Sequence, residues 1–119
     1  MKGIGVDIVE FSRIRAVKNK ENFVDKILSP AEKDLYTSFK HEKRQFEFLA
    51  GRFAAKEAIY KAATMLCTGY NFNDFAILND ETGAPYLLPP VSANVADYQN
   101  INISISHSDN YAVAFVVFS

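Results

Sequence analysis

Three polar side chains occupy positions where the surrounding pattern predicts a protein interior. Asp7 shares one face of a predicted strand with Gly3 and Gly5, where the missing side chains leave room for a group to approach. Glu57 lies inside the apolar stripe of a predicted helix, and His107 ends a strand whose inward residues are isoleucines. A buried, isolated carboxylate is costly unless it is paired or bound to a metal. Two such carboxylates suit a hard cation such as Mg²⁺, which also binds phosphate oxygens.

Each of these side chains also has an ordinary structural interpretation. Asp7 can end a strand and cap the turn after it, and His107, beside a turn, can be a hydrogen-bonded structural histidine. Glu57 precedes Lys61 by four residues, the favourable orientation for a helical ion pair worth only ~0.3–0.5 kcal/mol when exposed. Because the spacing alone does not bring the three side chains together, both interpretations stay open at this point.

Basic side chains form two groups that could bind anions. The first group follows the first strand with no acidic residue inside it, and it is either a solvated face or a surface for an acidic partner: Arg13, Arg15, Lys18 and Lys20. In the second group, Arg52 and Lys56 are like charges four residues apart on a helix, an arrangement that is unfavourable unless an anion lies between them. Phosphate is the natural candidate.

The charge of the chain is divided between its halves. The 119 residues carry 13 basic and 14 acidic side chains, a net charge of -1. All 13 basic residues lie at or before Lys61, so residues 1–61 have 13 basic against 9 acidic side chains, while residues 62–119 have only 5 acidic ones. An anionic partner for the first half therefore stays open, although the net charge argues against one.

Other function classes are excluded by composition. Cys67 stands alone, which excludes a disulfide framework and a cluster of thiolate ligands. The longest apolar run, residues 111–118, is far shorter than the ~20 residues of a membrane helix. Asp7 interrupts the first ten residues, which are therefore no secretory signal. We expect a cytoplasmic protein.

The elements that position these side chains predict one α+β domain over residues 1–119. Alternation over residues 2–9 predicts a strand, and residues 43–66 carry apolar side chains on nearly every face of a helix, which predicts a central, largely buried one. Further strands are expected over residues 74–78, 86–88, 101–106 and 111–118, with turns at 80–85 and 108–110. We therefore expect an antiparallel sheet packed on one long, largely buried helix, with short helices beside it.

Two local patterns refine this expectation. Residues 22–28 predict a short helix, and Ser29 begins the next one, because Pro30 suits the first helical position and Glu32 can close a capping box. The last strand, residues 111–118, is apolar on both faces and predicts a sheet that is covered on both sides.

Three stretches, taken together and in order, resemble a known family. GIGVDIVEFSRI at residues 3–14, FLAGRFAAKEAIYKA at 48–62 and SISHSDNYAVAFVV at 104–117 closely resemble the holo-[acyl-carrier-protein] synthases, the small class of 4'-phosphopantetheinyl transferases. The resemblance implies transfer of the 4'-phosphopantetheine arm of coenzyme A to a serine of apo acyl carrier protein, with release of adenosine 3',5'-bisphosphate. It also implies a homotrimer with sites at the subunit interfaces.

The resemblance carries residue roles as well. It implies that Asp7 and Glu57 are the catalytic Mg²⁺ ligands and that Lys61 helps the leaving group. The serine can lose its proton to Asp7, to Glu57 or to a metal-bound water, and these alternatives stay open. The substrate phosphates would be bound by a basic set: Arg52, Lys56, Lys61 and His107, with Lys43 and Arg44 at the 3'-phosphate.

Docking of the acidic carrier protein is implied for the first basic group, Arg13, Arg15, Lys18 and Lys20, with Phe23 as an apolar contact. One departure from the family pattern is Ala84, which stands where the family often has lysine, so the turn is kept and one basic contact is lost. Two rival hypotheses have no motif of their own: a binding module for acidic helical partners and a phosphohydrolase built on the same carboxylates.

Overall fold

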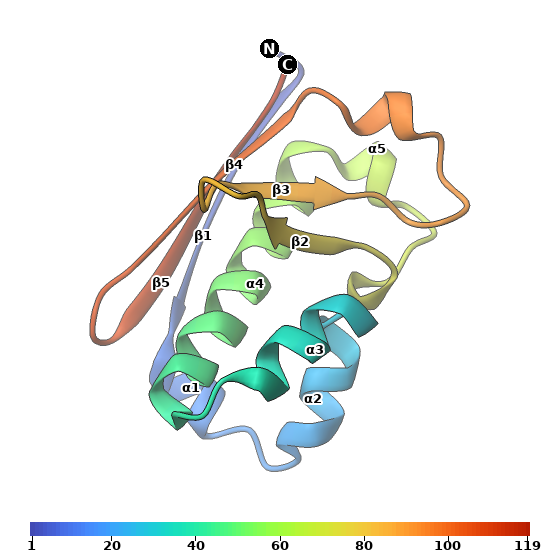
Figure 1. Cartoon of the computed structure of the whole chain (residues 1–119). Helices are drawn as coiled ribbons and strands as arrows, with labels where there is room; N and C mark the ends of the chain where they lie inside the picture. Colours follow the sequence, from blue (N-terminus) through green and yellow to red (C-terminus); the bar gives the residue numbers. More distant parts are fainter.

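The computed structural model describes residues 1–119, an α+β protein built around one long helix (Figure 1). Helix α4 crosses the centre of the molecule and packs against a three-stranded antiparallel sheet with the order β1–β5–β4. The β2–β3 hairpin forms a second, two-stranded sheet. The elements of the large sheet and its helix are β1 (Gly3–Glu10), α4 (Glu42–Ala62), β4 (Ile101–His107) and β5 (Tyr111–Phe118). The predicted fold class is therefore confirmed.

The remaining elements lie around α4. Short helices α1 (Phe11–Arg15), α2 (Lys20–Ile27) and α3 (Pro30–Ser38) connect β1 to α4, and α5 (Thr64–Cys67) follows it. The hairpin consists of β2 (Ala76–Asn79) and β3 (Pro85–Leu88), with 3₁₀ turns at Phe72–Asp74 and Val95–Tyr98. No helix is both long enough and apolar enough to span a membrane.

The prediction of a buried central helix is confirmed, but its end differs. Twelve of the residues of α4 are buried, and they occupy most of its circumference. The predicted helix over residues 43–66 is interrupted at Ala63, whose φ of -140° and ψ of 52° leave the helical region. Propensity did not indicate this break, because alanine itself favours a helix. Lys61 consequently lies in the last turn of α4.

The glycines of β1 serve the approach of α4 and not of a ligand. A Cβ on Gly3 would lie 1.8 Å from the Ala62 carbonyl oxygen, and one on Gly5 would lie 2.0 Å from the Ala58 carbonyl oxygen. The room expected beside Asp7 is thus filled by the helix backbone, and that sequence interpretation is wrong. Only glycine allows the strand and helix to pack at this distance.

The large sheet is covered on one face only, contrary to the expectation of cover on both sides. The inner residues of β5, such as Ala114 and Val116, are fully buried against α4. On the outer face, Ile4 and Val6 are each 53% exposed and Phe115, which pairs with Val6, is 44% exposed. The apolar character of both strand faces was read correctly, but within one chain nothing packs on the outer face.

The α3 capping box is confirmed as predicted. The Glu32 backbone N–H donates to Ser29 Oγ at 3.3 Å, and the Ser29 N–H donates to Glu32 Oε1 at 2.8 Å. Helix α2 begins two residues earlier than predicted, because Asn19 caps it by accepting a hydrogen bond from the Asn22 N–H at 3.0 Å. The strand predicted from residue 74 begins at Ala76, after the 3₁₀ turn.

Candidate functional site

Asp7 and Lys61 meet at the edge strand β1, on the side where helix α4 packs. Asp7 lies in the middle of this edge strand, and its side chain is 21% exposed. Lys61 Nζ lies 3.4 Å from Asp7 Oδ1 and donates to the Val6 carbonyl oxygen at 2.9 Å. Glu57 is half-buried one helical turn before Lys61. Side chains four residues apart share one side of a helix, so Glu57 lies on the side of α4 that carries Lys61.

The ion pair of Lys61 forms with Asp7 and not with Glu57. The helical Glu57–Lys61 ion pair, one of the interpretations that the sequence left open for Glu57, is therefore absent. The structure also shows Asp7 in the interior of the strand and not at its end, so Asp7 caps no turn. Asp7 is therefore the carboxylate that pairs with the Lys61 ammonium, and Glu57 makes no ion pair.

The donor chemistry of this cluster fits a hard divalent cation with few protein ligands. Asp7 and Glu57 supply carboxylate oxygens, which Mg²⁺ prefers. No group of three or more histidine, cysteine, aspartate or glutamate side chains could surround a metal ion. A cation bound here would take its other ligands from water and from phosphate oxygens, which is the usual pattern for Mg²⁺.

His107 lies away from this cluster, at the other edge of the sheet. It ends β4, and its Nδ1 lies 3.5 Å from Glu47 Oε2 on α4. In the same region Lys43 Nζ lies 3.9 Å from Asp109 Oδ1 in the β4–β5 turn. Because β5 separates β1 from β4, His107 lies two strands from Asp7 and two residues further along the sheet, a backbone separation of roughly 12 Å. One chain therefore holds the predicted site residues in two groups.

Arg44, in the first turns of α4, borders a groove. The groove has a volume of about 370 Å³ and lies between α3, α4 and the β2–β3 hairpin, with Leu35, Asn79 and Tyr86 among its lining residues. The Arg44 guanidinium lies 4.7 Å from the centre of the Phe39 ring. The groove therefore combines a mostly apolar lining with a cation at its border.

Lys56 is fully buried and its ammonium is saturated. Its Nζ donates to Glu32 Oε1 at 2.6 Å and to three backbone carbonyl oxygens: Ile27 and Phe72, both at 2.7 Å, and Phe75 at 2.8 Å. An ammonium group has three N–H donors, so four acceptors leave none for a phosphate. Burial lowers the pKa of Lys56, and the Glu32 carboxylate opposes that shift.

Arg52 is also directed into the protein. Its Nε donates to the Ile77 carbonyl oxygen at 2.9 Å, its Nη2 donates to Asn79 Oδ1, and its guanidinium lies 4.4 Å from the centre of the Phe48 ring. Burial lowers the pKa of Arg52 to about 10, against the favourable charge of Glu32. The anion expected beside this basic pair is therefore supplied by the chain itself, as the Glu32 carboxylate.

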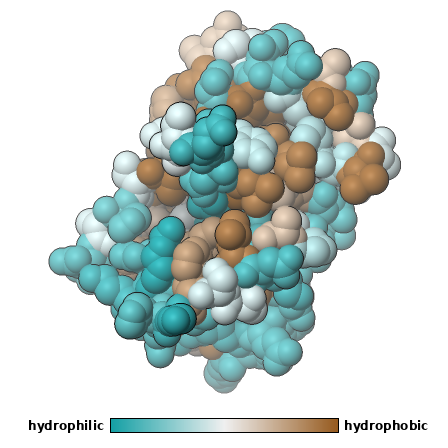
Figure 2. Space-filling model, in the orientation of Figure 1, coloured by the Kyte–Doolittle hydropathy of each residue, from teal (hydrophilic) through white to brown (hydrophobic).

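The first basic group is exposed on α1 and the start of α2. Arg13, Arg15 and Lys18 are exposed, whereas Lys20 is half-buried with its Nζ 4.3 Å from the centre of the Phe46 ring. Phe23 is half-buried, with its ring centre 5.5 Å from that of Phe53 on α4. Hydrophilic side chains cover the lower part of the view in Figure 2, where α2 and α3 lie.

Sequence reasoning missed the two acidic residues that pair with Lys56 and His107. Glu32 was recognised as a capping residue but not as the partner of Lys56, and Glu47 was not recognised as the partner of His107. The capping-box pattern could have drawn attention to Glu32. No local pattern marks Glu47, because its partner lies on a strand far along the chain.

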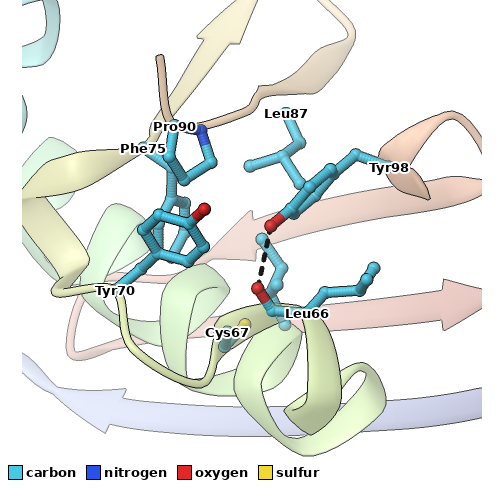
Figure 3. A pocket seen from close by; sticks show the side chains of 8 residues that line it. Leu66, Cys67, Tyr70, Phe75, Leu87, Pro90 and Tyr98 are labelled. Atoms are coloured by element: carbon cyan, nitrogen blue, oxygen red, sulfur yellow. Dashed lines mark hydrogen bonds between the residues drawn. The ribbon is translucent and has the colours of Figure 1, made fainter. Parts of the chain in front are cut away.

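The lone cysteine belongs to an apolar cavity and not to a site (Figure 3). The cavity has a volume of about 10 Å³, room for about one water molecule, and is lined by Cys67, Tyr70 and Tyr98 among others. The Tyr98 hydroxyl donates to the Leu66 carbonyl oxygen at 2.8 Å. Burial raises the pKa of the Cys67 thiol to about 11, which keeps it a thiol at neutral pH.

Comparison with known proteins defines the class to which this fold and site belong. Residues 3–116 match the 4'-phosphopantetheinyl transferase superfamily, and the chain belongs to this family. Within it, the chain is 44% identical over 114 residues to holo-[acyl-carrier-protein] synthase of Acholeplasma laidlawii strain PG-8A, covering 96% of this chain and 92% of that protein. It is 43% identical over 119 residues to holo-[acyl-carrier-protein] synthase of Staphylococcus aureus strain Newman, with coverages of 97% and 92%.

Solved structures of holo-[acyl-carrier-protein] synthases have the same fold. The Neisseria meningitidis protein matches with a TM-score of 0.80 and 27% identity, over 100% of this chain and 98% of that one. The Bacillus anthracis protein in complex with CoA (3',5'-ADP) matches with a TM-score of 0.74 and 37% identity, over 97% of this chain and 93% of that one. The Helicobacter pylori protein in complex with coenzyme A matches with a TM-score of 0.74 and 34% identity, over 98% of this chain and 99% of that one.

Proposed function

We infer that this protein transfers the 4'-phosphopantetheine group of coenzyme A to a serine of apo acyl carrier protein, giving holo acyl carrier protein and adenosine 3',5'-bisphosphate. The observation that carries this inference is the similarity over nearly the whole chain to holo-[acyl-carrier-protein] synthases, with 44% identity to one of them. Related structures that contain coenzyme A support the donor. The test is the intact mass of apo carrier protein after incubation with the enzyme and coenzyme A, with and without Mg²⁺. A carrier protein that gains no phosphopantetheine would refute the inference.

Asp7 and Glu57 are proposed to hold Mg²⁺ at the edge of β1. When bound, the ion neutralises negative charge on the pyrophosphate of coenzyme A. Lys61, which now lies against Asp7, is proposed to turn its ammonium toward the leaving bisphosphate and stabilise it. We expect Asp7→Ala and Glu57→Ala to lose transfer by ~10²-fold or more while remaining folded. If either variant loads carrier protein as fast as the wild type, the metal assignment is wrong.

Lys43, Arg44 and His107 are proposed to bind the nucleotide end of coenzyme A. All three are exposed cations or potential cations, and the groove beside Arg44 has a mostly apolar lining. Arg52 remains a proposed phosphate contact at the inner end of this region, whereas Lys56 has no free donor. Arg44→Ala should raise KM for coenzyme A and leave KM for carrier protein unchanged, because only coenzyme A carries the 3'-phosphate that Arg44 is proposed to bind. Steady-state kinetics with each substrate varied in turn would measure the two constants.

A homotrimer with sites between subunits is proposed as the active form. The two groups of site residues are separated within one chain, and the outer sheet face exposes a continuous apolar surface: Ile4, Val6, Ile8, Val113 and Phe115. Packing these faces together would bury that surface. In the proposed assembly, Lys43 and His107 of one subunit lie beside Asp7 of the next. Val6→Asp should give an inactive monomer in sedimentation experiments, because a charge cannot be buried there cheaply. A monomeric wild type with full activity would refute the assembly.

The exposed basic residues of α1 and α2 are proposed to dock the acidic carrier protein, with Phe23 as the apolar contact. Arg13→Glu and Arg15→Glu should weaken binding of carrier protein far more than binding of coenzyme A. Lys40→Glu is a matched control, because it makes the same charge change at an exposed residue outside this surface. Equal losses of affinity for both substrates would contradict the docking role of these two arginines.

A further inference from the structure

Lys56 joins three separate segments of the chain to the central helix. Its ammonium binds the carbonyl oxygen of Ile27, the last residue of α2, and the carbonyl oxygens of Phe72 and Phe75, the first residue of the 3₁₀ turn before β2 and the residue just after that turn. Its fourth partner is the carboxylate of Glu32 in the first turn of α3. All four partners lie far from Lys56 in the sequence, so this contact is purely tertiary.

Glu32 extends the same cluster. Its Oε1 also accepts the Ser29 N–H at 2.8 Å, which caps α3, and its Oε2 accepts the Ile77 N–H of β2 at 2.8 Å. Neither the Lys56 nor the Glu32 side chain is exposed to solvent. The pair therefore fixes the junction between α2 and α3, together with the start of β2, against one position on α4.

Stability alone is a weak reason for such a pair. Well-packed apolar side chains of similar volume often replace a buried ion pair without loss of stability, because desolvation of two charges offsets much of their attraction. A directional, saturated cluster instead selects one arrangement of the segments that it binds. The relevant arrangement here is that of α2 relative to α4, because α2 carries Phe23 and Lys20 of the proposed docking surface while α4 carries Glu57.

We propose that Lys56 is a positioning residue for carrier-protein binding: by holding the end of α2 it aligns the docking surface with the Asp7–Glu57 cluster. This inference rests on the proposed function. Lys56 is adjacent to Glu57 in α4, so one turn of helix carries both the proposed metal ligand and the anchor of the docking helix. A lysine at the carbonyl end of a helix also supplies the hydrogen bond that the last turn lacks.

The other contacts of α2 do not replace this anchor. The Asn73 side-chain amide donates to the Asp25 carbonyl oxygen at 2.9 Å, and Lys33 pairs with the Asp25 carboxylate, but both contacts are partly or fully exposed. Phe23 packs edge-on against Phe53, and Val24 and Ile27 are buried in the core. These apolar contacts are less directional than the hydrogen bond from Lys56 to the Ile27 carbonyl oxygen, so we expect α2 to shift relative to α4 when that bond is lost. Small errors in the placement of a reacting group are costly to transfer, so such a shift should reduce productive docking.

The experiment compares the double variant Lys56→Met with Glu32→Gln to the wild type. Removing both charges avoids an uncompensated buried charge, and methionine keeps most of the volume of lysine. We expect KM for apo carrier protein to rise ~10-fold or more and KM for coenzyme A to stay within about 2-fold of the wild type. The rate at saturating carrier protein, and hence kcat, should stay close to that of the wild type. A merely structural role would lower the folded fraction and hence the maximal rate, without changing either KM.

Tyr98→Phe is a matched control. It removes a buried hydrogen bond that holds the 3₁₀ turn Val95–Tyr98 to the Leu66 carbonyl oxygen, away from α2. It should change stability without changing KM for carrier protein. Should the double variant fail to fold, Glu32→Asp keeps both charges of the pair but shortens the carboxylate side chain that holds Lys56, Ser29 and Ile77, and it should shift KM for carrier protein in the same direction.

Calorimetric titration with apo carrier protein, without coenzyme A, separates the two levels of inference. Weaker binding by the folded variant supports the positioning role. If wild type and variant bind the carrier protein equally tightly and the wild type still modifies it, the role of Lys56 is refuted and the proposed function stands. If the wild type neither binds nor modifies the carrier protein, the proposed function itself fails and the inference fails with it.

Discussion

Replacing Gly5 with alanine tests how the site is assembled, because it perturbs the contact between β1 and α4. A Cβ at this position would lie 2.0 Å from the Ala58 carbonyl oxygen and 2.9 Å from its carbonyl carbon. These atoms belong to a helix backbone, which cannot rotate away as a side chain can. Ordinary contact would require β1 to retreat by more than 1 Å, and Asp7 lies only two residues further along the strand.

The magnitude of the effect follows from this overlap. Extra methyl groups in a packed core usually cost ~1–3 kcal/mol, because neighbouring side chains adapt. Here the obstacle is backbone, and β1 is paired with β5 along its whole length. We therefore expect Gly5→Ala to lower the free energy of unfolding by ~3 kcal/mol or more, a large part of the ~5–15 kcal/mol of a typical domain. Transfer activity should fall as well, because Asp7 moves away from Glu57.

Urea unfolding of the two proteins is the assay. A loss of this size should lower the midpoint by ~2 M for a small protein. Gly51→Ala is the matched control, since its Cβ would meet only the Ile105 side chain at 3.3 Å, and alanine gains ~1 kcal/mol of helix propensity over glycine. We expect this control to stay within ~1 kcal/mol of the wild type. If the urea midpoint of Gly5→Ala is as close to that of the wild type as the midpoint of the Gly51→Ala control, the tight packing of β1 on α4 is refuted.

Two further predictions concern stability. Because burial raises the pKa of Cys67 from 9.0 to about 11, the folded state keeps a proton that the unfolded state loses. The contribution of this thiol to the free energy of unfolding is thus full below pH 9 and falls by ~2–3 kcal/mol as the pH rises to 11. Cys67→Ala should reduce the loss of stability over this range in urea titrations, and the raised pKa of Tyr98 leaves a residual slope of the same sign. An unchanged slope in the variant would contradict this. Ser29→Ala removes the acceptor of the Glu32 N–H and should cost ~1 kcal/mol in thermal unfolding, whereas Ser92→Ala in an exposed loop should be neutral.

Local interactions explain which elements could be predicted. The capping box at Ser29 and Glu32, the alternation of β1 and the β4–β5 turn all depend on neighbours within a few residues, and the structure contains each of them. The boundaries that differ, at Asn19, Ala63 and Ala76, depend on capping and packing that residue periodicity does not encode. The fold class followed from the order of these elements.

The site was predicted only in part, for a physical reason. Residue spacing placed Asp7 and Glu57 on inward-facing positions, and both are half-buried, but it could not identify their neighbours. On a helix that is apolar on nearly every side, spacing does not distinguish a cation that faces solvent from one that faces the interior. Lys56 was therefore interpreted as a phosphate ligand, although it is saturated by Glu32 and three carbonyl oxygens.

The amino-acid sequence by itself determined the family, the α+β architecture and the acidic and basic side chains from which the site is built. Only the tertiary structure decided how these charges are paired: Lys61 with Asp7, Lys56 with Glu32, and His107 with Glu47. Each pair joins segments that are distant in the chain. Electrostatic attraction depends on the distance between charges in space and on their burial, and neither quantity can be read from positions along the sequence.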